Sequence, residues 1–222
     1  MKIILFGGTG MVGQGVLREC LSDPRVERVL MVVREVQGGE QPAKVVGLVN
    51  RNFFNWEGAE VAFEGYDACF FCLGTSAVGM KETEYRRITY DLTLGVADVL
   101  LRSGVKTFVY VSGQGTNEHS RQMWARVKGE TESALMQMPF KSVYCFRPGF
   151  IQPLDGIRSK TAWYQAMYNV TGWMYPVLRR VAGRFLTNTQ EVGRAMISAA
   201  ADGYEKRVLE TADIQAAAKR SS

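Results

Sequence analysis

Histidine is nearly absent from this chain of 222 residues, which contains only His119. A single histidine excludes a metal site built on several histidines and leaves no good general base for a serine triad. We expect His119 to lie in a solvent-exposed loop, and we assign it no role.

Cysteine is also scarce, and its placement does not resemble a disulfide framework. Cys20, Cys69, Cys72 and Cys145 all stand in apolar stretches. Cys69 and Cys72 form a C-x-x-C spacing, but the run Ala68–Leu73 is typical of a buried strand, whose alternation sends these two thiols to opposite faces. A shared metal is therefore disfavoured, and unpaired thiols indicate a reducing, cytoplasmic location.

Long apolar runs are missing as well. The opening run Ile3–Phe6 is too short for the core of a signal peptide, so we expect no targeting segment. Residues 156–190 are no transmembrane span either, because Asn169, Gly172, Pro176, Arg179 and Arg180 interrupt the ~20 apolar residues that such a helix needs.

Acidic residues are absent from residues 156–190, although the chain carries 22 of them against 27 lysines and arginines. The bases of this segment account for the whole excess of +5, and they are Arg158, Lys160, Arg179, Arg180 and Arg184. Aromatic residues lie between them: Trp163, Tyr164, Tyr168, Trp173, Tyr175 and Phe185. A local basic segment indicates an anionic ligand or a membrane surface, whereas nucleic acid would call for basic character along the whole chain.

Three interpretations of this basic aromatic segment stay open. It is a lid whose aromatic residues pack on the rest of the fold, a pocket for an aromatic or anionic small-molecule substrate, or a peripheral contact with a membrane surface. The sequence does not indicate an oligomeric state.

Short apolar runs alternate with helical patterns along the rest of the chain. The runs predict strands buried on both faces at Lys2–Phe6, Arg28–Val33, Lys44–Val49, Ala68–Leu73, Thr107–Val111 and Ser142–Phe146. Apolar stripes predict helices from Val12 to Leu21, from Tyr85 to Leu100 and from about Ser120 to Met136, and we expect the tail Ala216–Ser222 to be frayed. The alternation predicts an α/β fold: a Rossmann-like, doubly wound parallel sheet in one domain over residues 1–222, with a small helical C-terminal region on the substrate side.

The most informative motif follows the first strand and reads Gly7-Gly8-Thr9-Gly10-Met11-Val12-Gly13. Gly7 permits a sharp turn, Gly10 lets the backbone approach a pyrophosphate, and Gly13 lets the helix pack closely on the strand. The free amides at the start of the helix would face the phosphates. We therefore predict that Gly7, Thr9, Gly10, Met11, Val12 and Gly13 bind a dinucleotide cofactor.

The residues after the second strand bear on the choice of cofactor. NAD sites usually carry an acid at this point for the ribose 2′-hydroxyl, whereas an arginine suits the 2′-phosphate of NADP. Arg34 directly follows the last apolar residue of the strand, and its guanidinium can donate two parallel hydrogen bonds to a phosphate. We predict NADP(H) as the preferred cofactor, with NAD(H) as the alternative if Glu35 binds the ribose and Arg34 is only solvated.

Three later strand ends would meet the same crevice, because parallel strands bring their carboxyl ends to one edge. Leu73-Gly74-Thr75 follows the fourth strand, Ser112 follows the fifth, and Pro148-Gly149 follows the sixth. We predict that Leu73, Gly74, Thr75, Pro148 and Gly149 contact the cofactor.

These motifs resemble those of the atypical short-chain dehydrogenases/reductases, and most closely the NmrA-like group with the branch of the Tat-interacting, NADPH-binding tumour-suppressor protein. The resemblance covers most of positions 1–150, through the glycine motif, Arg34, Cys72-Leu73-Gly74-Thr75, Ser112, Val127-Lys128-Gly129-Glu130 and Phe146-Arg147-Pro148-Gly149. Beyond Phe150, where substrate contacts would lie, the match is weak.

The resemblance implies catalytic roles for Ser112 and Lys128. In the family, the matching lysine binds the nicotinamide ribose and lowers the pKa of a tyrosine, and the matching serine orients the substrate carbonyl. The tyrosine delivers a proton as hydride arrives at carbon. Here Trp124 stands at the tyrosine position, and an indole N–H is far too weak an acid to replace it.

Three hypotheses follow from this departure. In the first, the chain is an NADPH-dependent oxidoreductase or epimerase-like enzyme that takes its proton from another residue, such as Tyr85, Tyr164 or Tyr168, or from water held by Ser112 and Lys128. In the second, it binds NADP(H) without turnover as a redox sensor or protein-interaction module. In the third, Trp124 is a packing residue and its spacing is accidental, which the aligned Ser112 argues against.

Overall fold

A parallel sheet of seven strands forms the centre of the fold, with the strand order β3-β2-β1-β4-β5-β6-β9. The computed structural model describes residues 1–35, 38–39, 41–154 and 186–220. The strands of this sheet are β1 (Lys2–Phe6), β2 (Arg28–Val33), β3 (Val45–Val49), β4 (Ala68–Phe71), β5 (Thr107–Val111), β6 (Ser142–Arg147) and β9 (Val208–Glu210). A second, smaller sheet pairs β7 (Phe150–Gln152) with β8 (Leu186–Asn188).

Burial on both faces explains why the central strands are continuous apolar runs. In β1, alternation sends Ile4 and Phe6 into one core and Ile3 and Leu5 into the other, and all four side chains are fully buried. β1 pairs in parallel with β2 on one side and β4 on the other, so that Ile4 lies opposite both Leu30 and Cys69. The sheet grows outward in both directions from β1 and β4, and doubly wound sheets bind their ligands at such a switch point.

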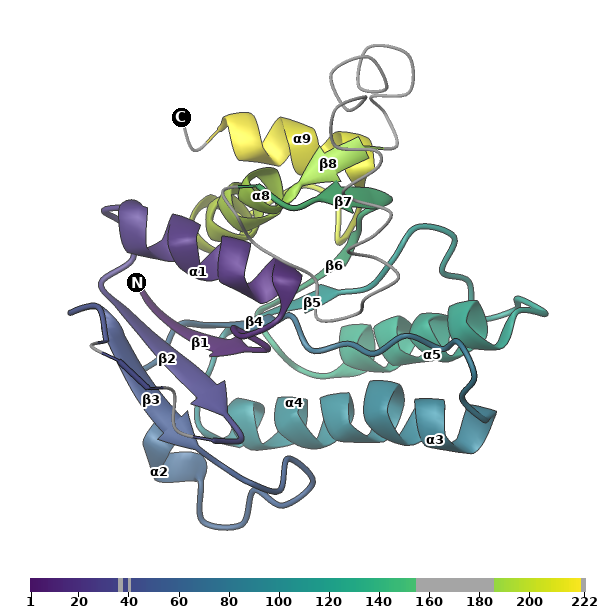
Figure 1. Cartoon of the computed structure of the whole chain (residues 1–222), viewed down its shortest axis with the longest axis horizontal. Helices are drawn as coiled ribbons and strands as arrows, with labels where there is room; N and C mark the ends of the chain where they lie inside the picture. Colours follow the sequence, from purple (N-terminus) through teal and green to yellow (C-terminus); the bar gives the residue numbers. More distant parts are fainter. Residues whose placement is uncertain (36–37, 40, 155–185, 221–222) are drawn as a thin grey trace.

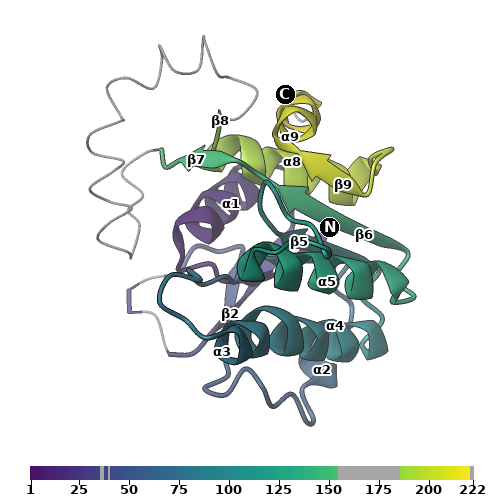
Figure 2. The same cartoon turned by 90° about the vertical axis from the view of Figure 1, so that its right-hand side faces the viewer.

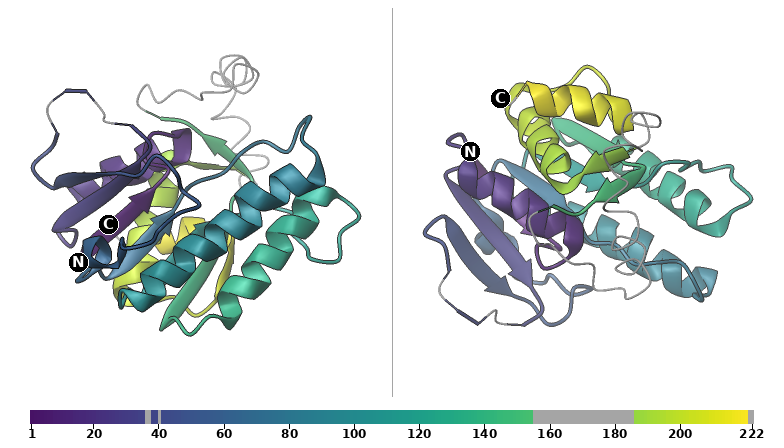
Figure 3. Two further views of the ribbon diagram at one scale, coloured as in Figure 1. Left: turned by 90° about the horizontal axis from the view of Figure 1, so that it is seen from below. Right: turned by 45° about the horizontal axis from the view of Figure 1, so that its top comes forward.

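Helices cover both faces of the sheet (Figure 1). One face carries α1 (Met11–Ser22), α8 (Thr189–Asp202) and α9 (Thr211–Lys219), and the other carries α2 (Glu60–Phe63), α4 (Leu92–Arg102) and α5 (Met123–Gln137). The short helix α3 (Glu82–Arg86) passes through the π-helical turn η1 (Arg87–Asp91) into α4. Figure 2 shows the two helical layers on either side of the sheet, and the left view of Figure 3 shows α4 running beside α5.

The predicted doubly wound sheet is confirmed, and each predicted strand is present to within two residues. Three details of the prediction are wrong. The second helix is not one regular helix, because η1 interrupts it at Arg87–Asp91, and the third begins at Met123 instead of Ser120. The tail is not frayed from Ala216, because α9 continues to Lys219 and buries Ala217 and Ala218 in the core shared with α8.

The small C-terminal region is present as predicted, but most of the basic aromatic segment lies outside the described residues. Of residues 156–190, only 186–190 are described, and they form β8 and the start of α8. In the described part of the chain, no helix is long and apolar enough to cross a membrane. Cys69 and Cys72 belong to the cores on opposite faces of the sheet, as predicted.

The turn from β1 into α1 depends on two glycines. Gly7 has a φ of 77°, a conformation that side chains with a Cβ rarely adopt. A Cβ on Gly13 would lie 2.1 Å from the carbonyl oxygen of Gly7, so only glycine lets α1 approach the end of β1 this closely. The predicted reasons for glycine at both positions are confirmed.

Replacing Gly13 with Ala should therefore destabilise the chain, by about 2 kcal/mol or more, because the new methyl group must displace backbone. Gly95→Ala is the matched control: Gly95 lies on the exposed side of α4 with nothing within 4 Å of a new Cβ. That control should gain about 0.5–1 kcal/mol from the higher helix propensity of alanine. Urea unfolding measures both, and equal free energies for the two variants would contradict the close approach.

Candidate functional site

The carboxyl edge of the sheet carries two cavities that share Leu73 as a lining residue. We call the first the β2–β3 cavity. It has a volume of about 670 Å³ and is lined by Gly7, Thr9, Val32, Val33, Arg34, Glu35, Arg51, Phe53 and Leu73. The second, the β4–β5 cavity, has a volume of about 590 Å³ and is lined by Gly10, Met11, Val12, Cys72, Leu73, Gly74, Thr75, Ser76, Val111, Ser112, Gly113, Gln114, Lys128, Pro148, Gly149 and Ile151. Because both are lined by Leu73, the two cavities adjoin near the switch point between β1 and β4, and we call them together the crevice.

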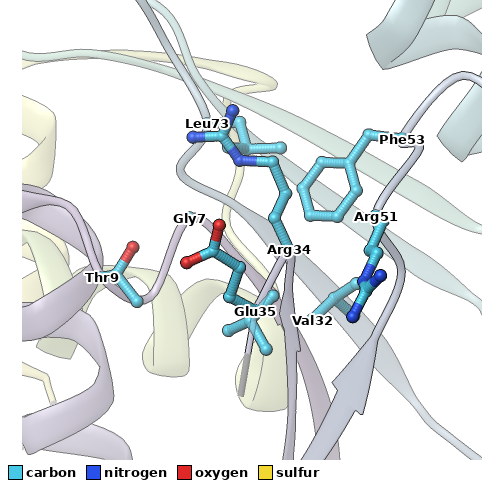
Figure 4. A pocket seen from close by; sticks show the side chains of 9 residues that line it. Gly7, Thr9, Val32, Arg34, Glu35, Arg51, Phe53 and Leu73 are labelled. Atoms are coloured by element: carbon cyan, nitrogen blue, oxygen red, sulfur yellow. The ribbon is translucent and has the colours of Figure 1, made fainter. Parts of the chain in front are cut away.

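Two arginines line the β2–β3 cavity. Arg34 follows β2 and Arg51 follows β3, and both side chains are exposed. Among the described residues, neither guanidinium has a hydrogen-bond or ion-pair partner. The ring of Phe53 lies between them in Figure 4, held by Phe6 at 6.0 Å and by Trp56 at 5.6 Å between ring centroids. Two unpaired guanidiniums beside an aromatic wall suit an anionic group attached to a flat ring.

Glu35 lines the same cavity, so both sequence alternatives for the cofactor have a side chain in place. Figure 4 shows the Glu35 carboxylate turned toward the Gly7–Thr9 turn, whereas the Arg34 side chain extends toward Leu73. The carboxylate suits a ribose hydroxyl, and the arginines suit a phosphate.

The glycine motif joins the two cavities. Gly7 and Thr9 line the first, whereas Gly10, Met11 and Val12 line the second. Helix α1 begins at Met11, and the first amides of a helix have no partner within it. These amides therefore form an anion-binding end at the centre of the crevice.

Ser112 is buried in the floor of the β4–β5 cavity, with only 8% of its surface exposed. Its Oγ lies 3.1 Å from Oγ1 of Thr116, whose hydroxyl donates to the carbonyl of Gly113 at 2.8 Å. Because a hydroxyl has one proton, Ser112 is the donor in its bond with Thr116. The lone pairs of Ser112 stay available to a ligand that donates a hydrogen bond.

Lys128 reaches the same cavity from α5. Its Nζ donates to the backbone carbonyl of Ser112 at 3.1 Å and lies 5.6 Å from the ring centroid of Tyr110. Burial lowers the pKa of Lys128 to about 8, and the carboxylate of Glu132 opposes this by favouring the ammonium form. The ammonium therefore titrates close to neutral pH, at a point where a ribose or a substrate oxygen could accept its hydrogen bonds.

Trp124 lines neither cavity. Its indole packs at 3.6 Å against the point where Gly115 would carry a Cβ. Tyr85, one candidate for the missing proton donor, also lines neither cavity and is only 2% exposed. Burial raises the pKa of its hydroxyl above the ordinary value, which makes Tyr85 a weaker proton donor. Tyr164 and Tyr168, the other candidates, lie outside the described residues.

The residues of the Val-Lys-Gly-Glu motif lie in three different environments: the core, the cavity and the surface. Val127 is fully buried, Lys128 reaches the cavity, and Glu130 forms an ion pair with Arg86 that ties α5 to α3. In the Phe-Arg-Pro-Gly motif, Arg147 pairs with the buried Glu132 of α5. Both motifs thus fix α5 beside the crevice.

The structure brings together nearly all the residues that the sequence predicted for the site. The exceptions are Gly13, which shapes the turn without lining a cavity, and Trp124, which lies outside both cavities. The sequence reasoning missed Arg51, Phe53, Thr116 and Glu132. Arg51 could have been found, because it follows a predicted strand end at the same edge as Arg34.

Comparisons with known proteins agree with this geometry. The sequence pattern of a family described as NAD(P)H-binding matches residues 7–138. Protein FMP52, mitochondrial, of Saccharomyces cerevisiae is 30% identical over 163 residues, which cover 72% of this chain and 69% of that protein. Protein HTATIP2 of Rattus norvegicus is 28% identical over 153 residues, 68% of this chain but only 62% of the rat protein, which is less than two thirds of its length.

Solved structures share the fold at low sequence identity. Gre2 of Candida albicans, solved in complex with NADPH, has a TM-score of 0.72 at 15% identity and covers 95% of this chain and 78% of its own. WbmG of Bordetella bronchiseptica, solved in complex with NAD, has a TM-score of 0.69 at 15% identity and covers 94% of this chain and 71% of its own.

The family match and the crevice together define an NAD(P)H-binding protein with a Rossmann-like sheet. The chain belongs to the NAD(P)H-binding family, and its relatives FMP52 and HTATIP2 confirm the resemblance to the atypical, NmrA-like group.

Replacing Lys128 with Met should change how stability depends on pH. Between the lowered pKa of about 8 and the ordinary value of 10.5, the unfolded wild-type chain binds more protons than the folded chain. Wild-type stability should therefore rise relative to that of Lys128→Met as the pH increases through this window, and the difference should stay constant below it. Urea unfolding at a series of pH values measures this, and a difference independent of pH would show that the lysine is not desolvated.

Proposed function

We propose that this chain binds NADP(H) across the two cavities and acts as an oxidoreductase or epimerase-like enzyme with a non-standard proton donor. The observation that carries the proposal is the arrangement of the two adjoining cavities, which share Leu73. Guanidiniums without a partner among the described residues stand at one end, helix amides in the middle, and Ser112 with Lys128 at the other. This sequence of groups complements a 2′-phosphate, a pyrophosphate and a nicotinamide ribose in that order.

Each part of the dinucleotide has residues in this chain that fit it. Arg34 and Arg51 would hold the 2′-phosphate, and the amides that follow Gly10 would hold the pyrophosphate. Lys128 would donate to the ribose, and the nicotinamide, when bound, supplies or accepts hydride. Ser112 would accept a hydrogen bond from a substrate hydroxyl or, after rotation of its Oγ–H, donate one to a carbonyl.

Among the described residues that line the β4–β5 cavity, Cys72 and Lys128 are the two with ionisable side chains. Burial raises the pKa of the Cys72 thiol and so keeps it protonated. Lys128 is therefore the group best suited to hold a water molecule or a substrate oxygen during proton transfer.

A second function is favoured by Trp124 alone. A protein that binds NADP(H) without turnover, as a redox sensor or interaction module, has no need of a tyrosine proton donor. Ser112 and Lys128 would then keep only their contacts with the cofactor.

The proposed location is the cytoplasm. All four cysteines are unpaired, and Cys20, Cys69 and Cys145 are buried, which suits a reducing compartment. The name of the yeast relative FMP52 gives a mitochondrial location for that protein.

Arg34→Ala should weaken NADPH binding by roughly tenfold to a hundredfold, because a charge-assisted hydrogen bond to phosphate is lost. NADH binding should stay within about twofold of wild type, since NADH lacks that phosphate. Fluorescence titration with both nucleotides measures the effect. Arg28→Ala is the matched control, because Arg28 is an exposed arginine at the opposite end of the same strand.

Glu35→Gln separates the two cofactor assignments. If the arginines select NADP(H), this variant should bind NADPH at least as well as wild type does, because a negative charge leaves the cavity. A wild-type preference for NADH that Glu35→Gln abolishes would instead assign the ribose to Glu35 and refute the role of Arg34.

Trp124→Phe should reduce a carbonyl probe such as 9,10-phenanthrenequinone at the wild-type rate with NADPH, because the indole is not the proton donor. Trp124→Tyr should also stay near the wild-type rate, because position 124 lines neither cavity and a phenol there would not reach the substrate. NADPH consumption at 340 nm measures the rates. Turnover by Trp124→Tyr but not by wild type would favour the non-catalytic function.

A further inference from the structure

Lys128 and Glu132 lie one helical turn apart on α5, at positions i and i+4, and therefore share one side of the helix. Lys128 extends to the cavity, and Glu132 is 2% exposed beneath it. A carboxylate so deeply buried needs a partner of opposite charge, because an unpaired buried charge is strongly unfavourable.

Arg147, at the end of β6, is that partner. Its Nε lies 3.0 and 3.1 Å from the two carboxylate oxygens of Glu132, and its Nη2 also donates to Glu132. Its Nη1 reaches Glu210 of β9 at 3.3 Å. A guanidinium bound through two nitrogens holds the carboxylate in one orientation, so the direction of Glu132 is fixed by β6.

Two opposing influences meet at Lys128. Burial disfavours its ammonium form, and the nearby Glu132 favours it. How strongly Glu132 acts depends on how much of its charge Arg147 already neutralises. Arg147 thus affects the protonation of Lys128 indirectly, by neutralising part of the charge of Glu132.

We propose that Arg147 and Glu132 are a pair of positioning residues that set the protonation of Lys128 and with it the pH range over which the chain holds NADP(H). The inference rests on the proposed function for the binding of NADP(H), but the ion pair and its effect on Lys128 do not require a substrate. Neither residue lines the cavity, so neither would touch the cofactor.

The other ionisable groups around this cluster are neutral or already paired. Tyr110 of β5 faces Lys128, and burial raises its pKa well above the ordinary value, so it stays uncharged. Burial likewise raises the pKa of Tyr85 of α3 and of Cys145 of β6. Glu210 of β9 is half-exposed and paired with Arg147. Variants that change the charge of Glu132 are therefore the ones expected to change the protonation of Lys128.

The test compares the titration of Lys128 with the pH dependence of NADPH binding. The 13Cε shift of Lys128, assigned with Lys128→Met in lysine-labelled protein, reports its protonation without cofactor. Fluorescence titration with NADPH from about pH 6.5 to 9.5 reports affinity. In wild type, both midpoints should fall near the pKa of about 8, with tighter binding on the acidic side.

Opposite shifts are expected from the two members of the pair. Glu132→Gln removes the carboxylate and should lower both midpoints by roughly half a unit or more. Arg147→Met leaves Glu132 unneutralised and should raise both by a similar amount, and Arg147→Lys, which keeps the charge, should return them toward wild type. Asp98→Asn is the control, because it removes an exposed carboxylate that pairs with Arg102 on α4, away from the cavities, and should leave both midpoints unchanged.

Shifts in the same direction for Glu132→Gln and Arg147→Met, or no shift in either, would overturn the proposal and leave a purely structural ion pair. If Arg147→Met does not fold, the shift in Glu132→Gln decides alone. A wild-type chain that does not bind NADPH at any pH would refute the proposed function, and the 13C titration would still decide whether the pair controls Lys128.

Discussion

The contact between Gly13 of α1 and the carbonyl of Gly7 is the constraint on which the crevice depends. It brings the start of α1 directly over the end of β1, so that the first amides of the helix face the switch point of the sheet. The other groups of the site lie on either side of this point. Arg34 and Arg51 follow β2 and β3 on one side of β1, and Ser112 and Lys128 lie beyond β4 on the other.

The two ends of the crevice use positive charge in different ways. Arg34 and Arg51 are exposed and screened by water, so they stabilise an anion only through direct contact. Lys128 is desolvated, and in that environment a carboxylate one helical turn away changes how readily its nitrogen holds a proton. Under the proposed function, selection among nucleotides would belong to the exposed end, and sensitivity to pH would belong to the buried end.

Local signals explain what the sequence could predict. The central strands are apolar on both faces and end at small residues. The apolar runs from Lys2–Phe6 onward therefore predicted the strands, their order along the chain and the edge at which a ligand is expected. The π-helical turn at Arg87–Asp91 was missed because the apolar spacing from Tyr85 to Leu100 fits a regular helix, although Ile88 in this turn is exposed. The alanine-rich end of α9 looked frayed because its stability comes from burial against α8, a tertiary contact that leaves no local signal in the sequence. The pairing of Glu132 with Arg147 was hidden for the same reason.

The packing of α8 against α1 also has a consequence for the order in which the chain can assemble. Helix α1 leaves the ribosome well before α8, yet Gly15 and Val16 on its outer side are covered by Thr189 and Gly193 of that later helix. Until that late helix arrives, the nascent half-sheet exposes an apolar flank to solvent and to chaperones. The half of the sheet that carries the glycine motif is thus completed only after α8 is made, although the motif itself is translated well before α8.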